Sequence, residues 1–218
     1  MDITVTEAAE ELGLDERTVR AHVMSGRLQV TRVIGRTQLI EHAGVQALQR
    51  GSGRGRLWNA TTAWAALELL DIRTTRRLGG SERSRLRARL RGISVAQLAH
   101  LASGRGRLRR FAQVRGDRER LRAQVQLSGV TALEDEDVAS VFDLVGSPSR
   151  LTMGYVPDLR EVALRNGLVE SAEGDVFLRE LGEHQAYIGL STIALDLYEL
   201  GDTRESAAGA RFLGSRLQ

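Results

Sequence analysis

The opening residues carry their apolar side chains at helical spacing. Ala8, Ala9 and Leu12 fall on one face of a helix, and the positions between them are mostly polar. Thr4 is followed three residues later by Glu7, a spacing typical of a capping box. The pattern therefore predicts a short amphipathic helix that ends at the glycine after Leu12.

A second helix is predicted directly after the first. Val19, His22 and Val23 lie at i, i+3 and i+4 and form its buried stripe. Asp15 can cap its first turn, and Gly26 stands where a helix C-terminus favours a left-handed residue. We interpret His22 as a partly buried core histidine rather than a ligand or a base. The positions left facing outward are Arg17, Thr18, Arg20, Ala21 and Met24.

After the second helix, the helical spacing of apolar side chains gives way to a pattern typical of β-strands. Residues 28–33 and 37–40 are rich in strand-forming side chains, and a turn at residues 34–36 separates them, which predicts a two-stranded hairpin. Residues 41–49 return to a helical pattern. An ordinary helical hairpin is the alternative interpretation of the first two helices.

The order of these elements resembles the winged helix-turn-helix of excisionase and MerR-type DNA-binding domains. The resemblance covers residues 3–39 and rests on the motifs Glu7-Ala8-Ala9, Leu12-Gly13, Arg17-Thr18-Val19 and Ser25-Gly26-Arg27-Leu28. It implies that the second helix enters the major groove of DNA. By that resemblance, the side chains that meet DNA are Arg17, Thr18, Arg20 and Ala21 on the helix, with Arg32 and Arg36 on the hairpin.

Composition restricts the class of protein. A chain of 218 residues with 42% hydrophobic and 27% charged residues is typical of a globular protein of one or two domains. The chain has no cysteine, which excludes disulfides and sulfur-ligated zinc, and no lysine, which excludes P-loop and Schiff-base chemistry. Because no apolar run could span a bilayer and no signal peptide is evident, we expect a cytoplasmic protein without membrane contact.

No residue pattern points to an enzyme. The four histidines lie far apart, and none has the spacing of a metal site or a catalytic triad. The acidic run at residues 134–137 falls consecutively on one predicted helix, so its carboxylates point in different directions. We interpret this run as a solvated face or a partner contact, and we expect no catalytic residue, no cofactor and no metal.

Charge is distributed unevenly along the chain. Residues 51–122 carry 18 arginines against 5 acids, and residues 123–218 carry 7 against 16, which leaves these segments near +13 and −9. Such a concentration marks a surface for a polyanion or for an acidic protein, while a solvated basic face is the plain alternative. The sequence leaves open whether the basic segment at residues 73–122 binds DNA or an acidic protein surface.

A glycine-rich basic stretch separates two predicted domains. Its composition indicates a flexible linker at residues 51–57, between a DNA-binding domain at residues 1–50 and a second domain at residues 58–218. Arg54 and Arg56 of this stretch can also follow a phosphate backbone.

The second domain mixes helical and strand-like periods, so the whole chain is predicted to be α+β and rich in helix. Helices are expected at residues 59–70, 81–91, 94–104, 117–122, 132–144, 157–166, 192–200 and 203–217. Strands are expected at residues 110–114, 124–127, 151–156, 168–170 and 176–181. The last two strands flank residues 172–175, the clearest hairpin in this half of the chain.

Residues 58–218 also resemble the C-terminal region of actinobacterial helix-turn-helix antitoxins of the abortive-infection E type. The matches are Trp58, Ala63-Trp64-Ala65, Ser84-Arg85-Leu86-Arg87, Leu127-Ser128-Gly129-Val130, Asp175-Val176-Phe177-Leu178-Arg179, Ala194-Leu195-Asp196-Leu197 and Gly201-Asp202-Thr203-Arg204. This resemblance implies a sequence-specific repressor that binds operator DNA and antagonises a nucleotidyltransferase-like toxin. The alternative is an excisionase-like DNA-architectural factor without a toxin partner. Either a homodimer or tandem binding of monomers would let so small a module reach two half-sites.

Overall fold

The computed structural model describes residues 2–12, 14–24, 28, 30–34, 37–42, 44–45 and 56–218. Two compact units divide the chain: Met1–Gly55, called unit 1, and Arg56–Gln218, called unit 2. Each unit combines helices with a β-sheet, so the chain is α+β, as predicted. In the described part of the chain, no helix is both long and apolar enough to cross a membrane.

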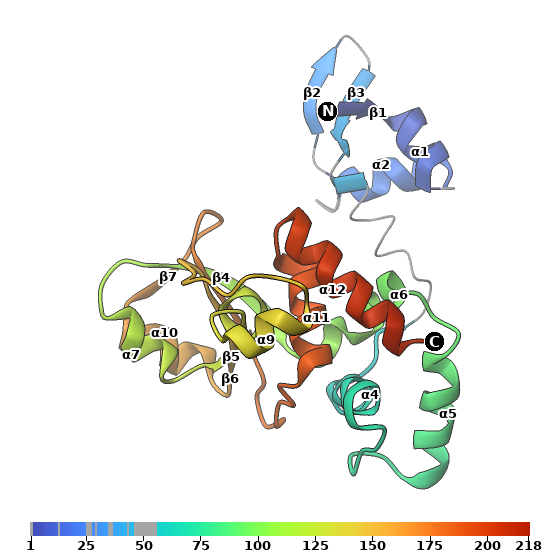
Figure 1. Ribbon diagram of the computed structural model, residues 1–218. Helices are drawn as coiled ribbons and strands as arrows, with labels where there is room; N and C mark the ends of the chain where they lie inside the picture. The colour runs from blue at the N-terminus through green and yellow to red at the C-terminus, as the bar shows by residue number, and fades with distance from the viewer. Residues whose placement is uncertain are drawn as a thin grey trace. The chain divides into compact units, whose positions relative to one another are not determined.

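The described residues of unit 1 include the two helices α1 and α2 and a three-stranded antiparallel sheet (Figure 1). Its elements are β1 (Asp2–Thr4), α1 (Val5–Leu12), α2 (Glu16–Met24), β2 (Val30–Ile34) and β3 (Thr37–Glu41). The strands β2 and β3 pair with each other, which confirms the predicted hairpin, and β1 pairs with the other edge of β3. Most of the helix predicted at residues 41–49 lies outside the described residues.

The core of unit 1 takes its buried side chains from β1, α1, α2 and β3, and from two residues, Leu28 and Val45, outside these elements. The partly buried side chains of Leu14 and Val23 pack against this core. The apolar faces predicted for both helices are confirmed, and His22 is half-buried on α2. The core side chains are Ile3, Val5, Ala8, Ala9, Leu12, Val19, Leu28, Ile40 and Val45.

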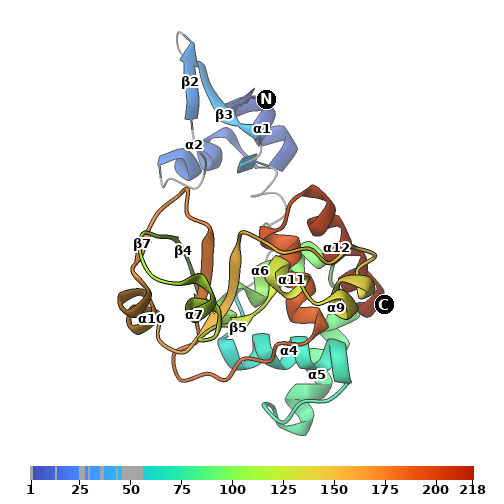
Figure 2. The ribbon, with the colours of Figure 1, turned by 60° about the vertical axis from the view of Figure 1, so that its left-hand side comes forward.

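Unit 2 is built around a five-stranded sheet with helices on both faces (Figure 2). The strands are β4 (Arg107–Gln113), β5 (Gln126–Leu127), β6 (Thr152–Val156), β7 (Leu168–Glu170) and β8 (Val176–Glu180). Their order is β5-β6-β8-β4-β7, in which the β6–β8 pair is parallel and the other pairs are antiparallel. One face packs against α7 (Arg118–Arg122) and α10 (Leu159–Asn166), and the opposite face packs against α8 (Gly129–Ala132) and α11 (Leu190–Leu200).

The larger core of unit 2 gathers around α4. The remaining helices are α4 (Ala60–Ile72), α5 (Gly80–Leu90), α6 (Val95–Ala102), α9 (Glu136–Val141) and α12 (Thr203–Arg216). Because α4 is apolar on most of its circumference, residues 63–67 are all buried. Its first turn is capped by Asn59, and the predicted capping box of Ser94 and Gln97 opens α6.

The hairpin predicted around residues 172–175 is wrong. Both of its strands are present, but β4 lies between β7 and β8 and pairs with each of them. The connection from β7 to β8 therefore crosses β4. At this crossing a Cβ on Gly174 would lie 2.0 Å from the carbonyl oxygen of Phe111, so only glycine allows the two backbones to approach.

The acidic helix predicted over residues 132–144 is interrupted. The helix α8 ends at Ala132 and α9 begins at Glu136. Asp135 caps α9, because its carboxylate accepts hydrogen bonds from the backbone N–H groups of Asp137 and Val138 at 2.9 and 3.3 Å. A side chain that favours the cap position has therefore divided the predicted helix. The other predicted elements of unit 2 are found within a few residues of their expected bounds.

A fully buried arginine connects the sheet of unit 2 with α11. Arg105 Nε donates to the hydroxyl of Tyr155 at 2.9 Å, and its remaining donors reach the Ala102 carbonyl and the carboxylates of Asp196 and Glu199. Glu199 accepts two of these hydrogen bonds, at 3.2 and 2.6 Å, in a bidentate arrangement. All five N–H donors of Arg105 are thus satisfied.

Asp196 is the main acceptor of this cluster. Ser128 and Tyr155 donate hydroxyl hydrogen bonds to its Oδ2 at 2.6 and 2.9 Å, and Arg179 lies beside the two acids and donates to Glu199. Burial raises the pKa of Asp196, but Arg105 and Arg179 outweigh that effect, so the pKa lies below its ordinary value of 3.8. Two arginines and two carboxylates therefore form a neutral cluster in which Glu199 alone is partly exposed.

Replacing one partner of this cluster is expected to leave buried charge uncompensated. Arg105→Met should lower the free energy of unfolding of unit 2 by about 3–5 kcal/mol. The matched control is Arg109→Met, because Arg109 pairs with Glu170 at 2.6 Å on the surface and should contribute at most about 1 kcal/mol. Urea unfolding followed by the fluorescence of Trp58 and Trp64 measures both values. Equal losses for the two variants would contradict the assigned role of Arg105.

Candidate nucleic-acid interface

The first turn of α2 is fixed by its cap. Asp15 Oδ1 accepts a hydrogen bond from the backbone N–H of Thr18 at 2.9 Å, and Oδ2 accepts one from the Thr18 hydroxyl at 2.8 Å. These two hydrogen bonds, the backbone one first, lower the pKa of Asp15 below its ordinary value of 3.8. The predicted cap is confirmed, and it sets the start of α2 at Glu16.

The capping box predicted for α1 is also present. The backbone N–H of Thr4 donates to Glu7 Oε2 at 2.7 Å, and the N–H of Glu7 donates to Thr4 Oγ1 at 3.2 Å. A further hydrogen bond joins the two helices, since the hydroxyl of Thr6 donates to Glu16 Oε1 at 2.7 Å. The start of α1 is thus tied to the start of α2.

Two of the predicted DNA contacts are exposed arginines on α2. Val19 is fully buried in the core of unit 1, whereas Arg17 and Arg20 are exposed. The side chain of Arg17 makes no hydrogen bond or ion pair with another described residue. Arg20 donates to Glu16 Oε2 at 2.6 Å, but both side chains of this pair are well exposed, so the pair is weak and another anion can replace it.

The other predicted contacts differ in what they can offer. Thr18 is half-buried and its hydroxyl hydrogen already serves the cap, so the hydroxyl can act toward a ligand chiefly as an acceptor. Arg32 is exposed on β2, opposite Leu39 of β3. Arg56 is exposed at the beginning of unit 2. The side chain of Ala21, and the whole of Arg36 and Arg54, lie outside the described residues.

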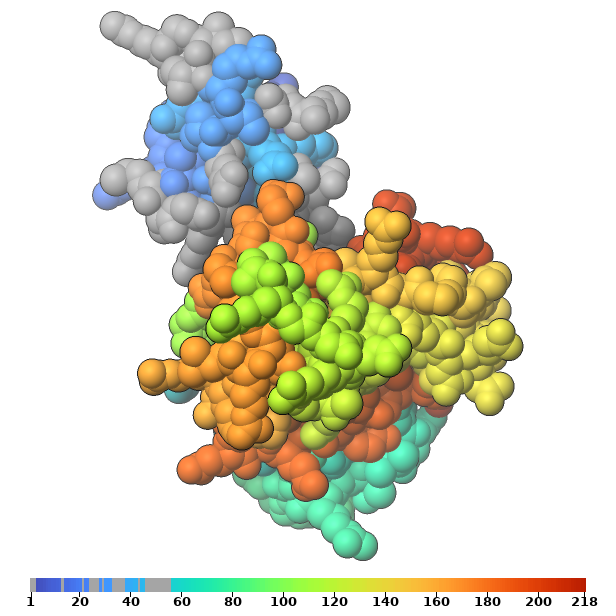
Figure 3. Space-filling view, turned by 90° about the vertical axis from the view of Figure 1, so that its left-hand side faces the viewer, coloured from blue at the N-terminus to red at the C-terminus, as the bar shows by residue number. Residues whose placement is uncertain are grey.

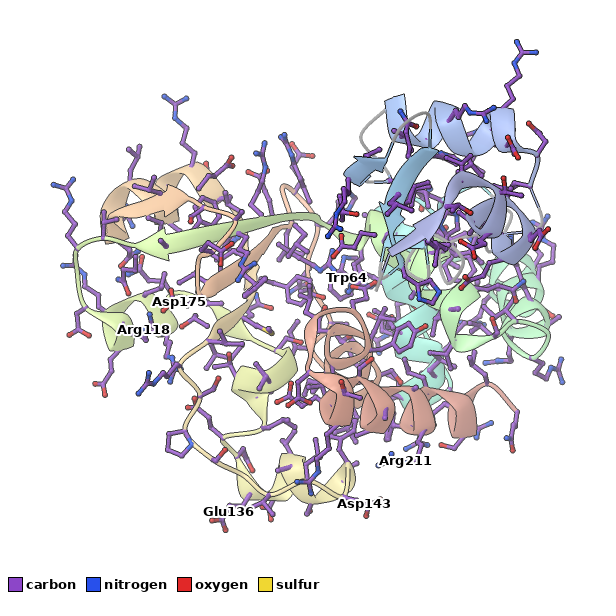
Figure 4. All side chains as sticks on the ribbon, turned by 90° about the horizontal axis from the view of Figure 1, so that it is seen from above. Trp64, Arg118, Glu136, Asp143, Asp175 and Arg211 are labelled. Atoms are coloured by element: carbon purple, nitrogen blue, oxygen red, sulfur yellow. The ribbon has the colours of Figure 1, made fainter. Side chains whose placement is uncertain are left out.

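The basic segment at residues 73–122 is partly neutralised inside unit 2. Arg77 pairs with Glu68, and four other arginines of the segment pair with acids outside it that come later in the chain, so folding cancels part of the charge separation seen along the sequence. One of these ion pairs, between Arg118 and Asp175, is labelled in Figure 4. The pairs are Arg77 with Glu68, Arg105 with Asp196 and Glu199, Arg109 with Glu170, Arg118 with Asp175, and Arg122 with Glu134.

Other arginines of this segment stabilise the turn that precedes α5. Arg83 and Arg87 donate to the backbone carbonyls of Thr75 and Arg73, at 3.1 and 2.6 Å. Arg85 on α5 is exposed and contacts no charged or hydrogen-bonding group among the described residues. The segment is therefore a mixture of structural and free arginines, a division that the sequence could not indicate.

Nothing in the described part of the chain resembles a metal centre. No group of three or more histidine, aspartate or glutamate side chains among residues 2–45 and 56–218, within the positions described, could hold an ion. Two residues of the acidic run at residues 134–137 have structural roles, because Glu134 pairs with Arg122 and Asp135 caps α9.

The cap of α2 gives a pH dependence that can be measured at one atom. Because the folded pKa of Asp15 is lowered, the cap's contribution to stability is complete above about pH 4 and is lost as the pH falls through the folded pKa. The amide proton shift of Thr18, followed by NMR against pH, should titrate with a midpoint below 3.8. Asp15→Asn is the control, since it keeps the cap and removes the titration. A midpoint at or above 3.8 would contradict the cap geometry.

Comparison of the chain with protein families, with curated proteins and with solved structures gives no match.

Proposed function

We propose that unit 1 is a winged helix-turn-helix module and that the protein is a sequence-specific DNA-binding repressor of transcription. In this proposal α2 lies in the major groove and the β2–β3 hairpin is the wing. The proposal rests chiefly on one observation: burial of Val19 leaves Arg17 and Arg20 together on the exposed side of α2.

The chemistry of these side chains supports the proposal. Arginine donates two parallel hydrogen bonds to the O6 and N7 acceptors of guanine, and it also pairs with phosphate. Arg17 has no competing partner among the described residues, and Arg20 has only an exposed one. The exposed Arg32 on β2 adds a cation on the hairpin, where a wing would meet the phosphate backbone.

The wider role extends the same proposal to unit 2. An antitoxin would repress its own operon through unit 1 and antagonise a toxin through unit 2. An excisionase-like factor would use unit 1 in the same way to bend its site, with no effect on transcription of a neighbouring gene. A transcriptional reporter behind the bound DNA separates the two roles, because only the repressor lowers its expression.

The DNA-binding proposal predicts different effects for matched arginine variants. On a duplex that covers the region upstream of its own gene, Arg17→Ala and Arg20→Ala should each weaken binding of the full chain by about 5- to 150-fold, because each removes contacts to DNA. Arg211→Ala is the control: it removes the same charge from an exposed position on α12 (Figure 4) and should change the affinity less than about twofold.

Fluorescence anisotropy with a labelled duplex measures these affinities. Circular dichroism of each variant verifies that unit 1 is still folded. Wild-type affinity in both α2 variants, or an equal loss in Arg211→Ala, would contradict the proposed interface.

A further inference from the structure

Unit 2 carries an open groove of about 690 Å³ between α10 and the strands β4 and β7. Its floor includes Phe111 and Leu168, which are buried in the smaller core of unit 2, and Ala163 of α10. Segments of β4 and of the chain from α10 to β8, coloured green and orange, form much of the side of unit 2 that faces the viewer in Figure 3. The groove therefore lies on the sheet face against which α10 packs, and α10 covers this face only in part.

The rim of this groove exposes aliphatic side chains. Val114, Leu164 and Val169 are 66%, 71% and 53% exposed, and all three line the groove. They are three of the seven large apolar side chains that the described part of the chain leaves exposed. A cluster of exposed aliphatic groups beside a concave surface is typical of a site for another molecule.

The same groove has a surplus of positive charge. Arg107, Arg115 and Arg160 are exposed, and their side chains make no hydrogen bond or ion pair with other described residues. The fourth arginine, Arg109, is paired with Glu170 at 2.6 Å. The second acid of the lining is Glu180, the last residue of β8. Its side chain accepts a hydrogen bond from the backbone N–H of Leu159, the first residue of α10, at 3.4 Å. Three guanidinium groups thus remain available at the edge of an apolar floor.

We propose that this groove binds an acidic amphipathic segment of a partner protein. Aliphatic side chains of that segment would cover Val114, Leu164 and Val169, and its carboxylates would pair with the three free arginines. This proposal concerns unit 2 alone and does not depend on DNA binding by unit 1.

The composition of the groove favours a protein over a nucleic acid. Single-stranded nucleic acids bind through exposed aromatic side chains on which bases stack. The aromatic side chain of the groove, Phe111, is only 3% exposed, so it offers no stacking surface. Duplex DNA could pair phosphates with the arginines, but it would leave Val114, Leu164 and Val169 without apolar partners, whereas an amphipathic peptide covers them with its own aliphatic side chains.

A defined pair of peptides tests the proposal on the full chain. The first probe is a fluorescent 16-residue peptide, about four turns of helix, with leucine on one helical face and glutamate on the others. The second has the same composition in an order that gives no apolar face. We expect the first peptide to bind at least about tenfold more tightly than the second, because only it presents aliphatic and acidic groups together.

Three variants locate the binding site. The double variant Arg115→Glu with Arg160→Glu, and the single variant Leu164→Ser, should each weaken binding of the first peptide by about tenfold or more. Arg85→Glu is the control, because Arg85 is also exposed, on α5, and lies outside the groove lining; this variant should bind the peptide like the wild type. Fluorescence of Trp58 and Trp64 verifies that each variant is folded.

Several results would overturn the proposal. These are no binding of the first peptide, equal binding of both peptides, or affinity that the groove variants leave unchanged. Sedimentation could instead show wild-type oligomers that Arg160→Glu abolishes, which would assign the groove to a second copy of this chain. Single-stranded DNA that binds the wild type and is lost in the groove variants would assign it to a nucleic acid.

Discussion

The burial of Val19 is the constraint on which the proposed interface depends. A helix of nine residues has little stability by itself, so α2 exists because the core of unit 1 holds it. That core fixes the rotation of α2 about its axis. Since Arg17 and Arg20 are three residues apart, one rotation brings both to the exposed side. The cap at Asp15 also fixes the residue at which α2 begins.

In unit 2 the arginines serve at least two physical purposes. Arg105 is enclosed with Asp196 and Glu199, and its charge is compensated inside the fold. Others remain exposed without a partner among the described residues, and three of these gather at one apolar groove. The net charge summed along residues 73–122 is therefore larger than the positive charge that the folded surface presents, because acids from residues 123–218 pair with some of these arginines. What matters for binding is which arginines the fold leaves free.

The sequence was sufficient where a signal is local. Helical spacing and capping pairs such as Thr4 with Glu7 and Ser94 with Gln97 predicted helices that the structure contains. The insertion of β4 between β7 and β8 could not be predicted, because strand order depends on contacts distant in sequence. A glycine such as Gly174 is favoured both in a hairpin turn and where one chain segment crosses another, so its presence could not distinguish the two. Arg105 is one of 31 arginines and lies 91 residues from Asp196, so only the fold identifies its role. The groove likewise combines residues from four separate elements, β4, α10, β7 and β8.

Selection from a random pool of duplexes tests sequence reading by α2 most directly. The full wild-type chain should enrich a shared motif, and Arg17→Ala should lose the preference at a single base pair of that motif while keeping the rest. A pool without any enriched motif, or a motif that Arg17→Ala leaves identical, would contradict the account.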